Sequence, residues 1–305
     1  MTKSNKMVVT VLVSVAIALV IGVIIAALMV GSSITGSGGT YEEVTGTGSG
    51  EVALIRIENV IVDSEDAIRQ LKKYRKRSDI GAIVLRVNSP GGGVVPSHEI
   101  YEEVRRTRDE GTPVVVSMGS VAASGGYYIA CGATRIVANP GTITGSIGVI
   151  SQFTDFEELF DKLGIGTKTI KSGKFKDIGN PTREMSEEEA ATIQAMIDNI
   201  YSQFVRIVAK SRSLEEDSVR VLADGRVYSG EHARDLGLVD TLGTLHTAVM
   251  IAGSLAGYED EPQIVQERQK QGFWDILIGE SARESLEEWR TRLNQTRLVE
   301  YRFSL

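Results

Sequence analysis

The sequence predicts an α/β fold of repeated strand-helix units, preceded by one transmembrane helix. Short runs rich in β-branched residues alternate with helical patterns from about residue 51 onward. Ahead of them, residues 7–30 form one uncharged, apolar stretch. Without that stretch and its flanks, roughly 250 residues remain, which fits one large domain better than two small ones.

The apolar stretch at residues 7–30 is 24 residues long. A helix of this length spans about 36 Å, enough to cross a bilayer with some tilt. The apolar region of a cleavable signal peptide is shorter, about 7 to 15 residues, so we expect a retained anchor. Lys3 and Lys6 precede the stretch and no basic residue follows it before Arg56. The positive-inside rule therefore predicts a single-pass cell-membrane protein with residues 1–6 cytoplasmic and the bulk of the chain outside the cytoplasm.

A tether and a folded domain are expected next. Fifteen of the twenty residues at 31–50 are Gly, Ser or Thr, a composition typical of a flexible tether. The domain then covers residues 51–258, and because its strands alternate with helices we expect a parallel sheet covered by helices. The expected strands are 52–57, 82–87, 114–117, 135–138, 146–150 and 168–170, and the expected helices are 66–77, 97–108, 122–130 and 186–210.

The rest of the chain is predicted to contain one long helix and a C-terminal appendage. Ser186 and Glu189 have the spacing of a capping box at the start of the long helix. Residues 259–305 form an appendage, with an apolar knot at 273–278 and a helix carrying Leu286, Trp289 and Leu293 on one face. We expect this appendage to pack against a subunit or another domain.

Composition and single residues exclude several classes of function. The net charge of -7 is spread over mixed acidic and basic residues, so nucleic acid is not an expected partner. Cys131 is the sole cysteine and lies in an apolar run, which indicates core packing. His98 begins an HExxE string, but a zinc site of that type needs a second histidine where Glu102 stands. We expect neither a metal nor a cofactor.

Two strand-to-helix junctions, residues 88–93 and 118–126, are unusually rich in glycine. Ligands of α/β sheets collect at the carboxyl ends of strands, where backbone N–H groups stripped of side chains can form an oxyanion hole. A tight turn that needs positive φ explains the glycines equally well. Ser124, at the start of a helix, is placed as a nucleophile would be, although a serine there is often only a helix cap.

A serine nucleophile needs a base. His98 belongs to a helix start, and His232 and His246 lie far along the chain in a helical region, which makes histidine a weak candidate. Lysine is the other base used with serine, when burial or a nearby cation leaves its amine neutral. The segment 171–178 offers three lysines, and position alone does not choose among them.

The strings at 88–93, 119–130, 144–149, 172–177 and 224–228 resemble the signal peptide peptidase A family, membrane-bound serine proteases related to the Clp protease and crotonase folds. The resemblance covers about residues 52–258. It implies that Ser124 is the nucleophile, Lys176 the general base and Ser146 the residue that orients the lysine. The N–H groups of Gly92 and Ser124 would form the oxyanion hole, with Gly91, one position away, as an alternative.

The resemblance further implies a serine endopeptidase with a Ser-Lys dyad and no cofactor, acting on released signal peptides at the outer face of the cytoplasmic membrane. Long members of that family look like two fused copies of this domain, so we expect a cyclic homo-oligomer whose protomers share each dyad. The alternatives are a related membrane protease acting on membrane-scaffold proteins, a crotonase-like acyl-CoA enzyme, and a scaffold that binds peptides without cutting them.

Overall fold

The computed structural model describes residues 19–20, 22, 40–269 and 300–302. The chain divides into a unit of Met1–Glu42 and Glu267–Gln295 and a unit of Glu43–Gln266 and Thr296–Leu305. Most of the expected anchor at 7–30, the apolar knot and the helix with Trp289 lie outside the described residues. Among the described residues, no helix combines the length and apolarity needed to cross a bilayer.

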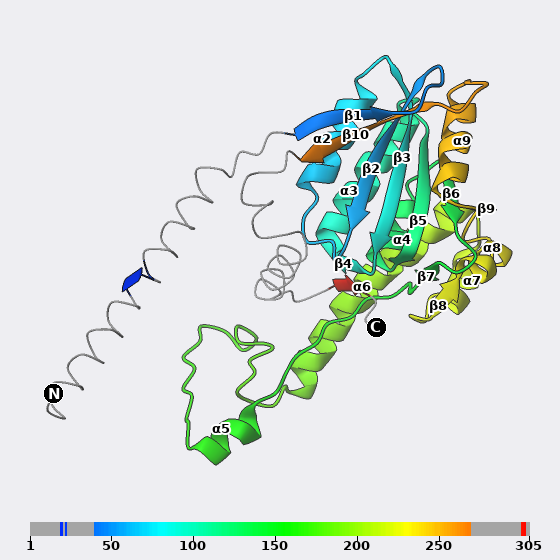
Figure 1. The fold of residues 1–305 in the computed structure, drawn as a ribbon. Helices are drawn as coiled ribbons and strands as arrows, with labels where there is room; N and C mark the ends of the chain where they lie inside the picture. Colours follow the sequence, from blue (N-terminus) through cyan, green and yellow to red (C-terminus); the bar gives the residue numbers. More distant parts are fainter. Residues whose placement is uncertain (1–18, 21, 23–39, 270–299, 303–305) are drawn as a thin grey trace, which may run out of the picture. The chain divides into compact units, whose positions relative to one another are not determined.

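A largely parallel sheet forms the centre of the second unit (Figure 1). Its strand order is β1-β10-β2-β3-β5-β6-β9, and β10, β2, β3, β5, β6 and β9 pair in parallel, which confirms the predicted α/β class. The strands are β1 (Thr40–Thr45), β2 (Glu51–Glu58), β3 (Ile80–Ser89), β5 (Val114–Ala123), β6 (Arg135–Ala138), β9 (Thr241–Leu242) and β10 (Gln263–Gln269). Strand β7 (Ile143–Gly145) runs parallel to the end of β5, and β8 (Val227–Ser229) is antiparallel to β7.

Helices cover both faces of this sheet, which explains why its strands read as nearly continuous apolar runs. Helices α2 (Glu65–Arg75), α3 (Val94–Asp109) and α4 (Gly125–Ala130) lie on one face, and α9 (Leu245–Leu255) lies on the other. In β2, Ala53 and Ile55 belong to the core under the first set of helices, whereas Val52 and Leu54 belong to the cluster under α9. Adjacent residues of one strand thus stabilise two separate apolar layers.

The long helix α6 (Glu187–Arg212) joins the domain to an extended segment, residues 151–186, here called the arm. The predicted capping box is confirmed, since Ser186 Oγ accepts the Glu189 N–H and the Glu189 side chain accepts the Ser186 N–H. The second half of α6 is anchored in the core by Phe204, Val205 and Val208. No residue of the arm is buried, and its one helix is α5 (Glu157–Leu163).

Several expected boundaries differ from the structure. The helix expected at 122–130 begins only at Gly125, because β5 continues to Ala123 by pairing with β7. The strand expected at 146–150 lies earlier in the chain, as β7 at Ile143–Gly145, because those residues pair with the end of β5. Residues 168–170 form no strand, since the exposed arm offers them no partner strand and leaves Ile170 91% exposed.

The sheet also extends past both expected ends of the domain. Strand β1 lies inside the segment predicted as a tether, and β10 pairs in parallel with β2 beyond residue 258. The remaining helices, α7 (Glu216–Leu222) and α8 (Gly230–Asp235), lie between α6 and β9 along the chain.

The anchoring of α6 gives a stability prediction. Phe204 is fully buried and meets Tyr128 edge to face, with ring centroids 4.9 Å apart. Phe204→Ala should lower the free energy of unfolding by about 3 to 5 kcal/mol through lost burial and a cavity. The exposed neighbour Gln203→Ala should change it by less than about 0.5 kcal/mol. Urea denaturation of both variants measures the difference, and equal losses would contradict this account of α6.

Candidate active site

Ser124 occupies the turn at which β5 becomes α4. Its φ of 52° lies in the left-handed region, and the residue is only 1% exposed. Such a backbone costs a non-glycine residue about 1 to 2 kcal/mol, so neighbouring bonds must hold it. The Ser124 N–H donates to the Gly145 carbonyl at 2.8 Å, and the Ser124 carbonyl accepts the Tyr128 N–H at 2.8 Å. Pairing with β7 and the first turn of α4 therefore fix the turn.

The triple glycine after β3 forms the short strand β4 (Gly91–Gly93). The Gly91 N–H donates to Ser89 Oγ at 3.1 Å, and the Gly93 N–H donates to the Ile61 carbonyl at 2.9 Å. Because donors alternate along a strand, the Gly92 N–H points to the opposite edge. A β-carbon on Gly92 would lie 2.2 Å from the Ile61 carbonyl oxygen, so the backbone contact there requires glycine.

The opposite edge of β4 pairs antiparallel with β11 (Glu300–Arg302), drawn in red beside β4 in Figure 1. The register matches Tyr301 with Gly92. An extended backbone thus fits along the glycine strand, which is the geometry of peptide recognition by strand addition.

Strand β4 lies directly against the Ser124 turn. A β-carbon on Gly125 would be 2.6 Å from Ser97 Oγ and 3.2 Å from the Gly92 nitrogen. Ser97 Oγ in turn donates to the Gly93 carbonyl at 2.8 Å. Because Gly125 has no side chain, the two glycine-rich junctions can approach each other closely. This agrees with their predicted positions at the carboxyl ends of strands.

The expected oxyanion donors differ in availability. The Gly92 N–H lies on the edge of β4 that pairs with β11, whereas the Ser124 N–H is already engaged by Gly145 and so is not available in this structure. The next group along the chain, the N–H of Gly125, begins α4 and has no partner within the helix. The N–H of Gly91, the alternative to Gly92, donates to Ser89 Oγ.

The Ser124 hydroxyl is buried and has no hydrogen-bond partner among the described residues. His98, in contrast, places Nδ1 2.8 Å from the Tyr128 hydroxyl, and His246 Nδ1 lies 3.3 Å from a Glu261 carboxylate oxygen. No histidine that the structure describes is therefore paired with the candidate nucleophile.

Ser146 lies next to Gly145, the residue whose carbonyl accepts the Ser124 N–H. Ser146 is 6% exposed, with φ of 49°, and its N–H donates to the Arg226 carbonyl at 2.8 Å. Lys176 is exposed on the arm, and its N–H donates to the Gly173 carbonyl at 3.2 Å. The structure thus brings Ser124, Gly92 and the Ser146 backbone to one place, while Lys176 forms no hydrogen bond with Ser124 within the described chain.

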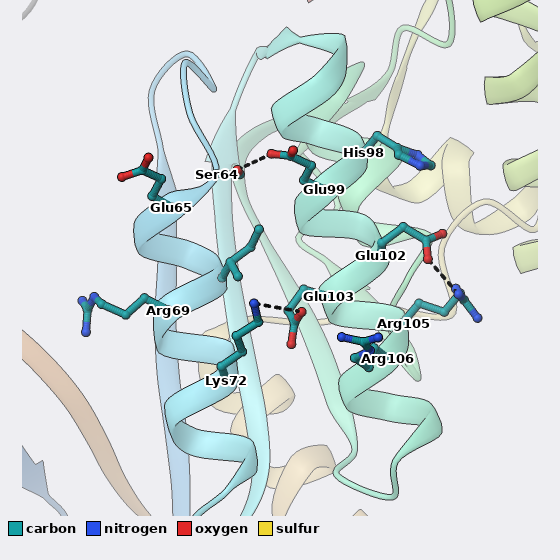
Figure 2. Close-up of a pocket in the computed structure, with 11 residues that line it drawn as sticks. Ser64, Glu65, Arg69, Lys72, His98, Glu99, Glu102, Glu103, Arg105 and Arg106 are labelled. Carbon is teal, nitrogen blue, oxygen red and sulfur yellow. Dashed lines mark hydrogen bonds and ion pairs between the residues drawn. The ribbon is translucent and has the colours of Figure 1, made fainter.

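Other nucleophile and ligand groups do not compete with this site. Complete burial raises the pKa of the Cys131 thiol to about 12, so it is protonated at neutral pH. Over residues 40–269, no group of three His, Cys, Asp or Glu side chains could hold a metal ion. Figure 2 shows a charged groove between α2 and α3, where Ser64 bonds Glu99 and Lys72 lies 4.0 Å from Glu103. None of the predicted site residues lines that groove.

Supporting side chains were not predicted from the sequence. Asn88 Oδ1 accepts the Val121 N–H at 3.2 Å and links the end of β3 to β5, while Ser89 and Ser97 hold β4. Each is a small polar residue within four positions of the glycine triple, which is the signal that could have identified them.

A buried, unpaired serine on a strained turn, beside a glycine strand that pairs with an extended backbone, fits the arrangement of a serine peptidase. The Clp protease family model matches residues 54–155, in agreement with a Clp protease-like fold. The model described as peptidase family S49 matches residues 106–259, about half of the chain. The chain belongs to peptidase family S49 and is a serine peptidase.

Relatives support this assignment. The chain is 43% identical to a Synechocystis sp. protein named as a protease, over 69% of this chain and 76% of that one. It is 34% identical to an Enterococcus faecium protein named as signal peptide peptidase SppA, over 82% of this chain and 75% of that one. It is 36% identical to Protease 4 of Salmonella typhi, of which it spans 38%. Family membership sets aside the acyl-CoA enzyme alternative.

The Gly92 contact gives the prediction for this site. Gly92→Ala should reduce kcat on a fluorogenic peptide by about 10²-fold, because the β-carbon would displace β4 and with it the N–H that is expected to stabilise the oxyanion. Gly166→Ala, where the added β-carbon meets nothing within 4 Å, is the matched control and should retain activity. Equal activity of both variants would exclude a catalytic role for the Gly92 position.

Proposed function

We propose that this chain is a membrane-anchored endopeptidase in which Ser124 is the nucleophile and Lys176 the general base, and that it degrades released signal peptides outside the cytoplasm. One observation carries the peptide-cutting part of the proposal. Strand β4, which lies against the Ser124 turn, pairs antiparallel with an extended segment of chain, β11. A substrate backbone bound in the same way would pass alongside the buried hydroxyl.

The proposed reaction has two acyl-transfer steps. Neutral Lys176 accepts the Ser124 proton as Oγ bonds to the substrate carbonyl carbon, and the N–H groups of Gly92 and Gly125 stabilise the oxyanion. The peptide C–N bond then breaks, and the lysine ammonium returns the proton to the leaving amine. Water, deprotonated by the same lysine, releases the acyl group from Ser124. Ser146 orients the lysine, and no cofactor takes part.

The dyad is proposed to form between protomers of a cyclic homo-oligomer. Ser124 is buried with an unpaired hydroxyl, whereas Lys176 is exposed on an arm without a buried residue. The arm also exposes large apolar side chains, including Leu163 at 62% and Ile170 at 91%. A neighbouring copy that covers these side chains would receive Lys176 at its own Ser124, and such heterologous contacts close into rings.

Residues 7–30 and the Gly/Ser/Thr-rich segment that follows support the proposed location. An anchor with a tether would hold the catalytic domain near the bilayer surface, where released signal peptides remain. The names of the relatives agree with this substrate class. Cleavage of membrane-scaffold proteins is the competing substrate, and profiling of the cut peptides separates the two.

The dyad is tested by mutation. Ser124→Ala and Lys176→Ala should each remove nearly all turnover, because the two residues act as a unit. Lys174→Ala, two positions from the proposed base, should change turnover only mildly. Full activity of Lys176→Ala would refute the proposed base.

Mixed oligomers extend this test to the shared dyad. When inactive Ser124→Ala chains and inactive Lys176→Ala chains are dissociated and reassembled together, some interfaces receive both wild-type residues and should recover partial activity. Absence of recovery in confirmed mixed oligomers would place both residues of a dyad in one chain.

The topology is tested on intact cells. Lys3 and Lys6 before the apolar stretch predict that the catalytic domain lies outside, so protease added externally should digest it. Permeabilised cells provide the positive control. Complete protection in intact cells, with digestion after permeabilisation, would overturn the proposed orientation.

A further inference from the structure

The arm keeps a defined path without an apolar core of its own. Every residue from 151 to 186 is exposed or only partly buried, so burial of apolar surface contributes little to its shape. Polar contacts must therefore hold the loop that carries Lys176, and five hydrogen bonds come from one side chain, Arg183.

All five N–H groups of the Arg183 guanidinium have an acceptor. Toward the lysine loop, Nε donates to Asp177 Oδ2 at 3.1 Å and Nη2 donates to the Asp177 carbonyl at 3.2 Å. Toward α6, Nη1 and Nη2 donate to the two carboxylate oxygens of Glu189 at 2.8 and 2.5 Å. Nη1 also donates to the Glu184 carbonyl at 3.0 Å. The planar fork suits such bidentate bonding, which a lysine could not reproduce.

Glu189 gives this contact a rigid base. Its side chain is 4% exposed and also accepts the Ser186 N–H at 3.0 Å, as part of the capping box of α6. Hydrogen bonds from Arg183, and next from the Ser186 backbone, lower the pKa of Glu189 to about 2. A carboxyl with a lowered pKa stabilises the fold above its ordinary value near 4 and loses that contribution only as the pH falls toward 2. The contact is thus fully ionised wherever a lysine base would act.

Asp177, the residue after Lys176, is held from two sides. Its side chain is 11% exposed and pairs with Lys171 as well as with Arg183. Lys171 Nζ also donates to the Lys174 carbonyl at 2.9 Å, and the Asn180 N–H donates to the Asp177 carbonyl at 3.1 Å. The hydrogen bonds from Arg183, followed by those from Lys171, lower the pKa of Asp177. The carboxylate that is nearest in sequence to the proposed base is therefore already paired with two cations, Lys171 and Arg183.

A further ion pair links the loop to α6. Lys174 forms an exposed ion pair with Glu188 in the first turn of α6. The charged residues that pair with one another in the arm and in the first turn of α6 are thus Lys171, Lys174, Asp177, Arg183, Glu188 and Glu189. Within the described chain, the Lys176 amine has no ion-pair partner among them.

We propose that Arg183 is a positioning residue for the base: it fastens the Lys176 loop to α6 through Glu189 and withholds the Asp177 carboxylate from the Lys176 amine. The inference rests on Lys176 being the base. A carboxylate beside an amine favours its protonated form, and a protonated lysine cannot accept the Ser124 proton. Loss of Arg183 removes one of the two cations that hold Asp177, which allows its carboxylate to turn toward Lys176, and it also loosens the loop.

The pH dependence of kcat/KM distinguishes this role from a purely structural one. In Arg183→Gln, the pH midpoint at which kcat/KM rises should move upward by about one pH unit, giving about tenfold less activity below it. Adding Asp177→Asn should return the midpoint toward the wild-type value, because the competing carboxylate is gone. Lys162→Gln, which breaks an exposed ion pair with Glu158 elsewhere on the arm, is the matched control and should keep the wild-type profile. Size-exclusion chromatography checks that each full-length variant keeps its assembly.

Each outcome decides the matter. An unchanged midpoint in Arg183→Gln, or a double variant no better than Arg183→Gln alone, would overturn the inference. If Arg183→Gln shows no turnover, recovery in the double variant supports the inference and failure to recover overturns it. Turnover by Lys176→Ala in the same assay would refute the proposed base itself, which is a separate result from a normal Arg183→Gln profile beside an inactive Lys176→Ala.

Discussion

The left-handed backbone at Ser124 is the constraint on which the rest of the site depends. It turns β5 into α4 within one residue, and its cost is offset because several elements hold it at once. The Gly145 carbonyl, at the end of β7, accepts the Ser124 N–H, and Gly125 allows β4 to approach the turn. A relaxed turn at this position would separate the hydroxyl from the glycine strand.

The need to hold the Ser124 turn also explains why an additional strand, β7, joins the sheet beside the end of β5. Strand β5 has β3 on one side along most of its length, and on the other side first β6 and then β7. The change of neighbour occurs just before Ser124, so β7 is placed to bond the turn itself. Ser146, immediately after β7, is carried to the site by this exchange of strands.

Sequence patterns predicted the elements that burial determines. The strands around residues 52–57, 82–87 and 135–138 and the capped helix α6 were found close to where periodicity and capping indicated them. Patterns failed where pairing with a distant segment decides the structure. Strand β4 consists only of glycine, β1 lies in a Gly/Ser/Thr-rich run, and β11 comes from the far end of the chain. Strand propensity carries no information about such pairings.

Site prediction shows the same division. The glycine-rich junctions indicated the region of the site, and the family resemblance then assigned roles to Ser124 and Gly92. The Ser124 N–H was assigned to the oxyanion hole without knowledge of its bond to Gly145. The contact of Arg183 with Asp177 and Glu189 was not predicted from the sequence. Only the capping box that includes Glu189 was predicted, because the spacing of charged residues does not reveal which of several ion pairs forms.

The division between a buried core and a charged arm also has a chemical reason. A lysine base must be neutral, and removal from water favours the neutral amine. A lysine buried permanently in its own subunit would carry that desolvation cost during folding, before any partner is present. In the proposed assembly, an exposed lysine on an arm shaped by ion pairs would avoid this cost and would lose its water only where a neighbouring copy covered it. The proposed assembly would then create the base at the same step that brings it to Ser124, so an isolated protomer would hold a nucleophile without a base.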